Sequence, residues 1–193
     1  MSSEQNDTKT RILDATWKLL EGGDTNVRMS DIAKAVGISR QALYLHYPNR
    51  ADLLIATTRH IDIVKNVDAR LEKSRNAHSG SERLYAFIDA WCGYIPEIHG
   101  VSVALRQMQA NDDEAADAWD DRMQAVRHGC SAAISALAKD GMLNNELSPD
   151  AATDLIWALL SVENWERLVR DCNGTQTAYL AEMKRLAKAA LLT

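Results

Sequence analysis

The chain has 193 residues, enough for one or two domains with a real hydrophobic core. It contains no run of about 18 apolar residues and no charged-then-apolar leader, so we expect neither a membrane span nor a secretory signal, and a cytoplasmic location. Its three cysteines, Cys92, Cys130 and Cys172, are odd in number and widely spaced, which excludes a disulfide framework or a zinc site of the usual spacing. Buried thiols are the simple expectation for them, with redox sensing as the alternative.

The net charge of −5 is unevenly distributed along the chain. Residues 1–60 hold eight Lys and Arg against seven Asp and Glu, whereas residues 61–193 hold 14 against 20. Within residues 28–50, four basic residues face Asp31 alone, a local charge of +3. A basic segment in an otherwise acidic chain favours one face that binds a polyanion such as DNA.

The first predicted helix covers Thr8–Glu21, after the polar segment MSSEQND. Leu13, Trp17 and Leu20 fall on one side of it, which predicts an amphipathic helix. Gly22 and Gly23 are expected to end the helix, because glycine is a common helix terminator. This helix would complete a three-helix head with the next two.

Residues 28–50, RMSDIAKAVGISRQALYLHYPNR, have the pattern of a helix-turn-helix. A helix starting near Ser30 places three apolar residues, Ile32, Ala33 and Val36, on its inward face. Gly37 can adopt a positive φ and stop this helix, and Ser39 can cap the next one through its hydroxyl.

The second helix of the motif is predicted to be short and to face DNA. If Ile38 and Leu43 point into the core, the three residues Arg40, Gln41 and Ala42 point outward, where base edges can be read. Tyr44, His46 and Tyr47 follow. Pro48 prevents continuation, and Asn49 can cap a new helix that opens with Arg50, whose charge suits phosphate.

This segment resembles the DNA-binding domain of the TetR family of bacterial transcriptional regulators. The family pattern is of the type IA..aGvs...lY.hF..K..Ll, and the chain reads IAKAVGISRQALYLHYPNRADLL. Tyr47 replaces the usual phenylalanine and Arg50 the usual lysine, which keeps a ring and a positive charge. The resemblance implies base-reading roles for Arg40, Gln41 and Ala42. It also implies phosphate contacts for Tyr44, His46 and Arg50. The expected DNA-binding residues are Ser39, Arg40, Gln41, Ala42, Tyr44, His46 and Arg50. The alternative is an ordinary helical hairpin with solvated polar groups.

From Ala51 onward every strong pattern is helical, which predicts an all-α fold. A stripe from Leu54 to Leu71 predicts one long helix, and Ser79-Gly80-Ser81 breaks the chain before a helix striped from Leu84 to Ile98. Pro96 and Gly100 are expected to weaken its end, with a short helix at residues 103–109. Further helices are predicted from Asn111 or Asp112 to Gly141, from Ser148 to Asn173, and from Thr175.

These patterns predict a helix-turn-helix domain over residues 1–50, completed by the start of the helix from residue 51, and a C-terminal helical bundle over residues 51–193. The last two helices carry more apolar surface than one core face needs, which predicts a homodimer that pairs them as a four-helix bundle. The resemblance implies the same dimer.

A small-molecule pocket is expected among the C-terminal helices, mainly on the strength of the resemblance. Its candidate lining residues are large and apolar or aromatic: Trp91, Tyr94, Met108, Trp119, Met123 and Trp157. The simpler alternative for each of them is ordinary core packing. The acidic residues from Asp112 to Asp121 could gather a cation, although a solvated helix face is the simpler interpretation. No metal or cofactor is predicted.

Three functions from different classes are compatible with these features. The favoured one is a ligand-responsive regulator, a repressor by family habit or else an activator, that binds a pseudo-palindromic double-stranded DNA operator as a dimer and responds to a small-molecule effector. The second is a non-specific architectural DNA binder, which the acidic remainder of the chain disfavours. The third is an enzyme, but no phosphate loop, HExxH motif or nucleophile elbow is present in the sequence.

Overall fold

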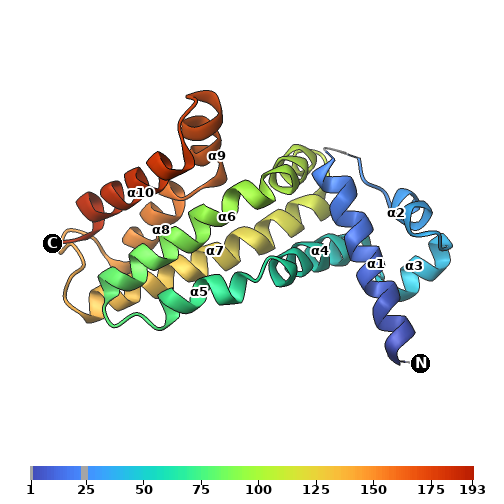
Figure 1. Ribbon diagram of the computed structural model, residues 1–193, viewed down its shortest axis with the longest axis horizontal. Coiled ribbons are helices and arrows are strands. Elements are labelled where there is room, and N and C mark those ends of the chain that lie inside the picture. Colours follow the sequence, from blue (N-terminus) through green and yellow to red (C-terminus); the bar gives the residue numbers. More distant parts are fainter. Residues whose placement is uncertain (1, 23–25) are drawn as a thin grey trace. The chain divides into compact units, whose positions relative to one another are not determined.

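The computed structural model describes residues 2–22 and 26–193, and these residues are predominantly helical, with no strand among them. The helices are α1 (Ser2–Glu21), α2 (Met29–Val36), α3 (Arg40–His46), α4 (Arg50–Val64), α5 (Val67–Arg75), α6 (Gly80–Gln109), α7 (Asp113–Lys139), α8 (Pro149–Leu159), α9 (Val162–Trp165), the π-helical segment η1 (Glu166–Asp171) and α10 (Gln176–Leu191) (Figure 1). The prediction of an all-α fold is confirmed.

The chain forms two compact units, which are described separately. The first comprises residues 1–65 and 98–123, and the second comprises residues 66–97 and 124–193. The continuous helices α6 and α7 therefore each supply residues to both units.

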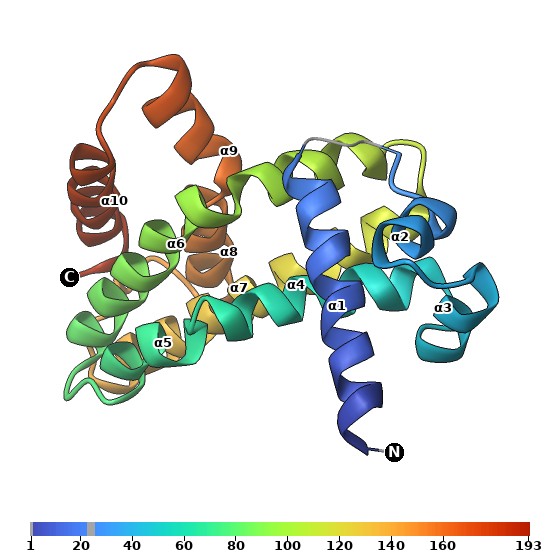
Figure 2. The same cartoon turned by 45° about the vertical axis from the view of Figure 1, so that its right-hand side comes forward.

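In the first unit α1 packs against α2 and α4, and α3 follows α2 at an angle (Figure 2). The helix α1 begins at Ser2, so the predicted start at Thr8 was too late. Its buried face is formed by Ile12, Thr16 and Leu20. The predicted Leu13 and Trp17 are only half-buried beside it. Gly22 follows the end of α1 as expected, while Gly23 lies outside the described residues.

The single helix predicted from Leu54 to Leu71 is two helices, and the prediction was wrong at Asn66. This residue adopts a left-handed conformation with φ of 54°, which an α-helix cannot contain. Asparagine tolerates this conformation better than most residues. The α4 helix therefore ends at Val64, and α5 begins at Val67.

The helix α6 does not end near Pro96 as predicted but runs through it for 30 residues. Proline has no N–H, so the carbonyl of Cys92, four residues earlier, lacks its usual helical donor. The side-chain Nε2 of Gln176 donates to this carbonyl at 2.9 Å, and Oε1 of the same amide accepts from Trp165 Nε1 at 2.7 Å. A side chain from α10 thus satisfies the backbone group that proline leaves free.

The predicted helix from Ser148 to Asn173 is also interrupted. It begins as expected, because the Ser148 hydroxyl accepts from the Ala151 N–H at 3.2 Å. It ends at Leu159, and Ser161 caps the short α9 before η1. The last helix begins after Thr175 as predicted.

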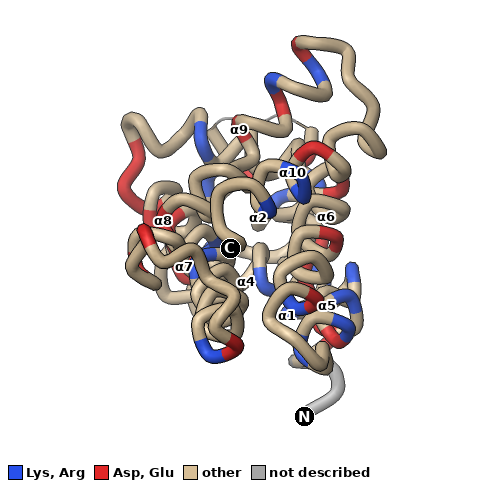
Figure 3. Tube along the Cα trace, turned by 90° about the vertical axis from the view of Figure 1, so that its left-hand side faces the viewer, with Lys and Arg blue, Asp and Glu red and all other residues tan. Residues whose placement is uncertain are grey.

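The second unit is held together by the apolar stripes of α6, α7 and α10. The predicted stripe of α6 is buried, from Leu84 to Ile98, as are Val126 to Leu137 on α7 and Tyr179 to Leu191 on α10. At Gly129 a Cβ atom would lie 2.2 Å from the Phe87 ring, so only glycine fits there. Charges of both signs lie on the surface of this unit, for example along α5 (Figure 3). None of the described helices is apolar over a stretch long enough to span a bilayer.

Candidate nucleic-acid interface

The turn between α2 and α3 forms as the sequence predicts. Ile32, Ala33 and Val36 are buried on the inward face of α2. Gly37 then takes a left-handed conformation with φ of 77°, and its N–H donates to the Ala33 carbonyl at 3.0 Å. A residue with a Cβ would be strained at this position, so glycine fixes where α2 ends and how the chain turns.

The helix α3 is anchored by the buried Leu43, and most of its other side chains are exposed. Ser39 caps it by accepting the Ala42 N–H at 3.1 Å, and the Leu43 side chain is fully buried beneath it. The side chains of Arg40 and Gln41 are exposed, as predicted. A short, capped helix with polar residues exposed at its N-terminus has the form of a recognition helix.

Arg40 is held in place by Tyr44, one turn later on α3. Its Nη2 donates to the Tyr44 hydroxyl at 3.1 Å, and the guanidinium carbon lies 5.5 Å from the centre of the tyrosine ring. Both contacts are on the exposed surface, so they restrict the arginine without burying it. The hydroxyl hydrogen of Tyr44 stays available for a phosphate oxygen.

Three other residues of the motif, Ala42, His46 and Tyr47, are half-buried. The Nδ1 atom of His46 is buried and has no hydrogen-bond partner among the described residues. Partial burial raises the pKa of the Tyr47 phenol, consistent with a ring packed against the domain.

Arg50 does not project to solvent, where the motif places a phosphate contact. It is the first residue of α4, after the Asn49 cap, and its side chain is only 10% exposed. Its Nη1 donates to Asp112 at 2.6 Å, its Nε to the Val27 carbonyl at 2.5 Å, and its Nη2 to the Met108 sulfur at 3.3 Å. In this arrangement the expected phosphate ligand is committed to partners within the first unit.

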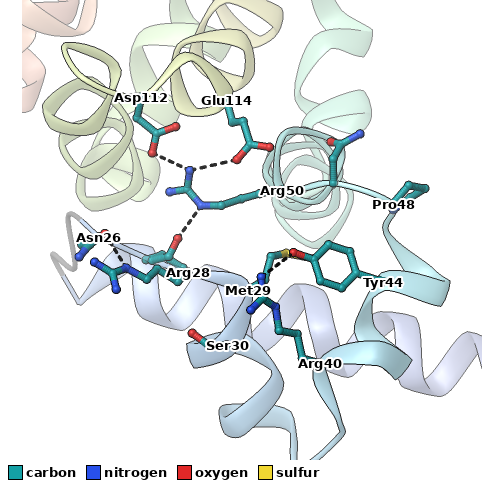
Figure 4. Close-up of a pocket in the computed structure, with 12 residues that line it drawn as sticks. Asn26, Arg28, Met29, Ser30, Arg40, Tyr44, Pro48, Arg50, Asp112 and Glu114 are labelled. Atoms are coloured by element: carbon teal, nitrogen blue, oxygen red, sulfur yellow. Dashed lines mark hydrogen bonds and ion pairs between the residues drawn. The ribbon is translucent and has the colours of Figure 1, made fainter.

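A polar groove of about 630 Å³ lies beside these residues (Figure 4). Its lining residues are Asn26, Val27, Arg28, Met29, Ser30, Arg40, Tyr44, Pro48, Asn49, Arg50, Asp112 and Glu114. In Figure 4 the Arg50 guanidinium points toward Asp112 and Glu114. The groove therefore brings the start of α2, the start of α3 and the start of α4 together with two carboxylates.

Comparisons with known proteins agree with this geometry. Residues 12–57 match the family model described as bacterial regulatory proteins, tetR family. This segment is a TetR-family domain. Over 59 residues the chain is 39% identical to the transcriptional repressor LfrR of Mycolicibacterium smegmatis, and over 54 residues 39% identical to the nucleoid occlusion factor SlmA of a Marinomonas species. These matches cover 31% and 28% of the chain, and only 31% and 27% of the two relatives.

The fold of the chain is matched over nearly its whole length by solved structures. A transcriptional regulator from Saccharomonospora viridis, solved in complex with choline, superposes with a TM-score of 0.74 at 18% identity. The superposition covers 97% of this chain and 99% of the other. An N-terminal helix-turn-helix followed by further helices is thus the fold of TetR-family transcriptional regulators.

The residues predicted to line an effector pocket do not all fall in one unit. Trp91, Tyr94 and Trp157 belong to the second unit, and the other three, Met108, Trp119 and Met123, belong to the first. Trp91 and Tyr94 meet edge to face, with ring centres 6.4 Å apart. The Trp91 Nε1 donates to the Leu160 carbonyl at 2.8 Å, so its polar atom already has a partner.

Two of the three candidates in the first unit, Met108 and Trp119, have partners there. The Met108 sulfur accepts from Arg50, and the Arg106 guanidinium lies 5.9 Å from the centre of the Trp119 ring. Met123 is half-buried. These contacts are those of a packed core, which was the alternative stated for each residue, and the pocket stays a prediction.

Two groups of residues at this interface were missed from the sequence. Leu45 on α3 is 85% exposed, the largest exposure among the described large apolar side chains. Its position between Tyr44 and His46 was the available signal, because Leu43 is the inward residue. The second group is Asp112 with Glu114, which we interpreted as a solvated face. The described residues contain no cluster of carboxylates, histidines or cysteines able to hold a metal ion.

Proposed function

We propose that the protein is a ligand-responsive transcriptional regulator, a repressor, that binds a pseudo-palindromic operator as a homodimer. The observation that carries the proposal is α3, a recognition helix whose N-terminus is capped and whose Arg40 is oriented by Tyr44. Arg40 suits the N7 and O6 acceptors of guanine, and Gln41 suits adenine. Exposed Leu45 can contact a thymine methyl group from the same helix.

The dimer is proposed to form through the helices after residue 148. Leu155 on α8 is 43% exposed and Leu168 on η1 is 40% exposed, although both are large and apolar. Pairing with the same surface of a second copy would cover them in the isologous interface typical of twofold dimers. A twofold dimer places two recognition helices on successive major grooves about 34 Å apart.

Release from DNA is proposed to follow binding of a small molecule by the C-terminal helices. The long helix predicted from Leu54 to Leu71 is interrupted at Asn66, so α6 and α7, which supply residues to both units, are the better candidates to transmit the change. An effector that favours one arrangement of these helices would shift the population of DNA-competent dimers. Choline is the first compound to test, because a fold relative binds it and aromatic rings recognise quaternary ammonium groups.

The decisive experiment selects bound fragments from random DNA and titrates the best sequence at fixed salt against a random duplex. A pseudo-palindrome preferred by at least about a thousandfold supports the regulator. Equal affinity for all sequences would replace it with the non-specific architectural binder. The effector is tested separately, by the shift in melting temperature with choline and related cations and by loss of operator binding.

A further inference from the structure

Arg50 makes a hydrogen bond from each of its three guanidinium nitrogens. Its guanidinium donates to the end of the α1–α2 connection, to α6 and to the α6–α7 connection, through Val27, Met108 and Asp112. All three nitrogens of the guanidinium are used. The side chain is only 10% exposed, so a phosphate that approaches Arg50 competes with the ligands that the arginine already has.

Asp112 is the ligand that a phosphate could replace. Its Oδ2 accepts from Arg50 at 2.6 Å, whereas its Oδ1 caps α7 by accepting the Ala115 N–H at 3.1 Å. Glu114 adds a second carboxylate oxygen 3.6 Å from the same Nη1. Carboxylate and phosphate oxygens suit the same guanidinium donors, so they compete for them.

The two carboxylates, Asp112 and Glu114, lie where they can affect DNA binding. Both carboxylates line the groove that Arg28 and Arg40 also line, and neither is sealed from solvent, since Asp112 is 28% and Glu114 44% exposed. Arg50 itself stands at the N-terminus of α4, where backbone N–H groups attract anions. A phosphate that reaches this helix end meets an arginine that is already neutralised.

We propose that Asp112 and Glu114 are positioning residues that withhold Arg50 from DNA and so limit the affinity of the head for phosphate, whatever the base sequence. The inference rests on the proposed function, because it requires that the head binds DNA. The carboxylates act through Arg50 and need no DNA contact of their own. Their effect is therefore on the number of phosphate contacts and leaves base discrimination by α3 unchanged.

The test is Asp112→Asn, measured as affinity for a random-sequence duplex over a series of salt concentrations. Asparagine is as good a helix cap as aspartate, so the start of α7 is preserved while the charge is removed. We expect about tenfold tighter binding at low salt and a log–log salt slope steeper by about one for each bound head. Glu114→Gln should shift both quantities in the same direction by less, because its oxygen is farther from Arg50.

The matched control is Asp121→Asn, which makes the same charge change within α7, the helix that Asp112 caps. Asp121 binds Arg59, whose side chain is already 66% exposed, so its loss uncovers no hidden arginine. Equal effects of the two variants, or weaker DNA binding by Asp112→Asn, would overturn the proposal. The proposal would also fail if Asp112→Asn tightened DNA binding just as much in an Arg50→Gln background. It would fail as well if Asp112→Asn lost helix content and Glu114→Gln bound DNA no more tightly than the wild type. Failure of the wild-type chain to bind any duplex would instead reject the proposed function.

Discussion

Gln176 is predicted to stabilise the second unit through its hydrogen bonds to the Trp165 indole and the Cys92 carbonyl. In Gln176→Ala both of these hydrogen bonds are lost, and the loss of a buried hydrogen-bond partner costs about 1–3 kcal/mol. Gln176 is itself only half-buried, so water can replace part of what is lost. We therefore expect the free energy of unfolding to fall by about 2 kcal/mol in total.

The assay is urea denaturation followed by far-UV circular dichroism, with Thr177→Ala, an exposed neighbour, as the control for changes at the start of α10. The decisive comparison repeats the substitution in a Pro96→Ala variant. There the alanine N–H can donate to the Cys92 carbonyl, so the hydrogen bond from Gln176 to this carbonyl is no longer needed. The loss from Gln176→Ala should then shrink by about 1 kcal/mol in the double-mutant cycle. An equal loss in both backgrounds would refute the explanation of how α6 passes through Pro96.

Three further predictions concern the recognition helix, the packing of α6 on α7, and the thiols. Arg40→Ala should reduce discrimination by about 1–3 kcal/mol at one base pair in each half-site while leaving affinity for random DNA nearly unchanged, as competition titrations would show. Gly129→Ala should lower stability by about 1–3 kcal/mol in urea titrations, despite the better helix propensity of alanine, because its Cβ would overlap the Phe87 ring. Burial raises the pKa of the Cys92 thiol from 9.0 to about 12, so only exposed Cys172 should react quickly with a thiol reagent at neutral pH. The same shift keeps the thiol protonated in the folded state after the unfolded chain has begun to ionise, so stability should fall as pH rises from about 9 to about 12.

Local signals in the sequence were sufficient for the helix-turn-helix and for most helix starts. Gly37, Ser39 and Ser148 act through their own backbone or through an N–H three residues away, so the chain near each of them determines its role. The buried stripe of α6 was predictable for the same reason, because a period of 3.6 residues defines a helix face.

The errors came from contacts between residues far apart in the sequence. No local pattern indicates that Gln176 compensates for Pro96, a contact that bridges 84 positions from Cys92, so the predicted end of α6 was wrong. Arg50 and Asp112 are 62 positions apart, and each was interpreted from its own neighbours, one as a phosphate ligand and the other as solvated surface. Asn66 was one exception, because asparagine adopts the left-handed conformation more often than most residues and was overlooked within an apolar stripe.

The carboxylate on Arg50 changes how the charge of the head should be counted. Residues 28–50 carry four basic side chains, but one of them is bound to Asp112, which leaves three to contact DNA in each head. A dimer should therefore show a salt slope shallower by about two than its basic residues suggest. A DNA phosphate that binds Arg50 competes with the Asp112 carboxylate. Replacing one anion by another gains less free energy than adding a phosphate contact to an unpaired arginine. A head with fewer phosphate contacts depends more on base contacts from α3. This ratio of contacts favours discrimination between DNA sequences over tight binding to all of them.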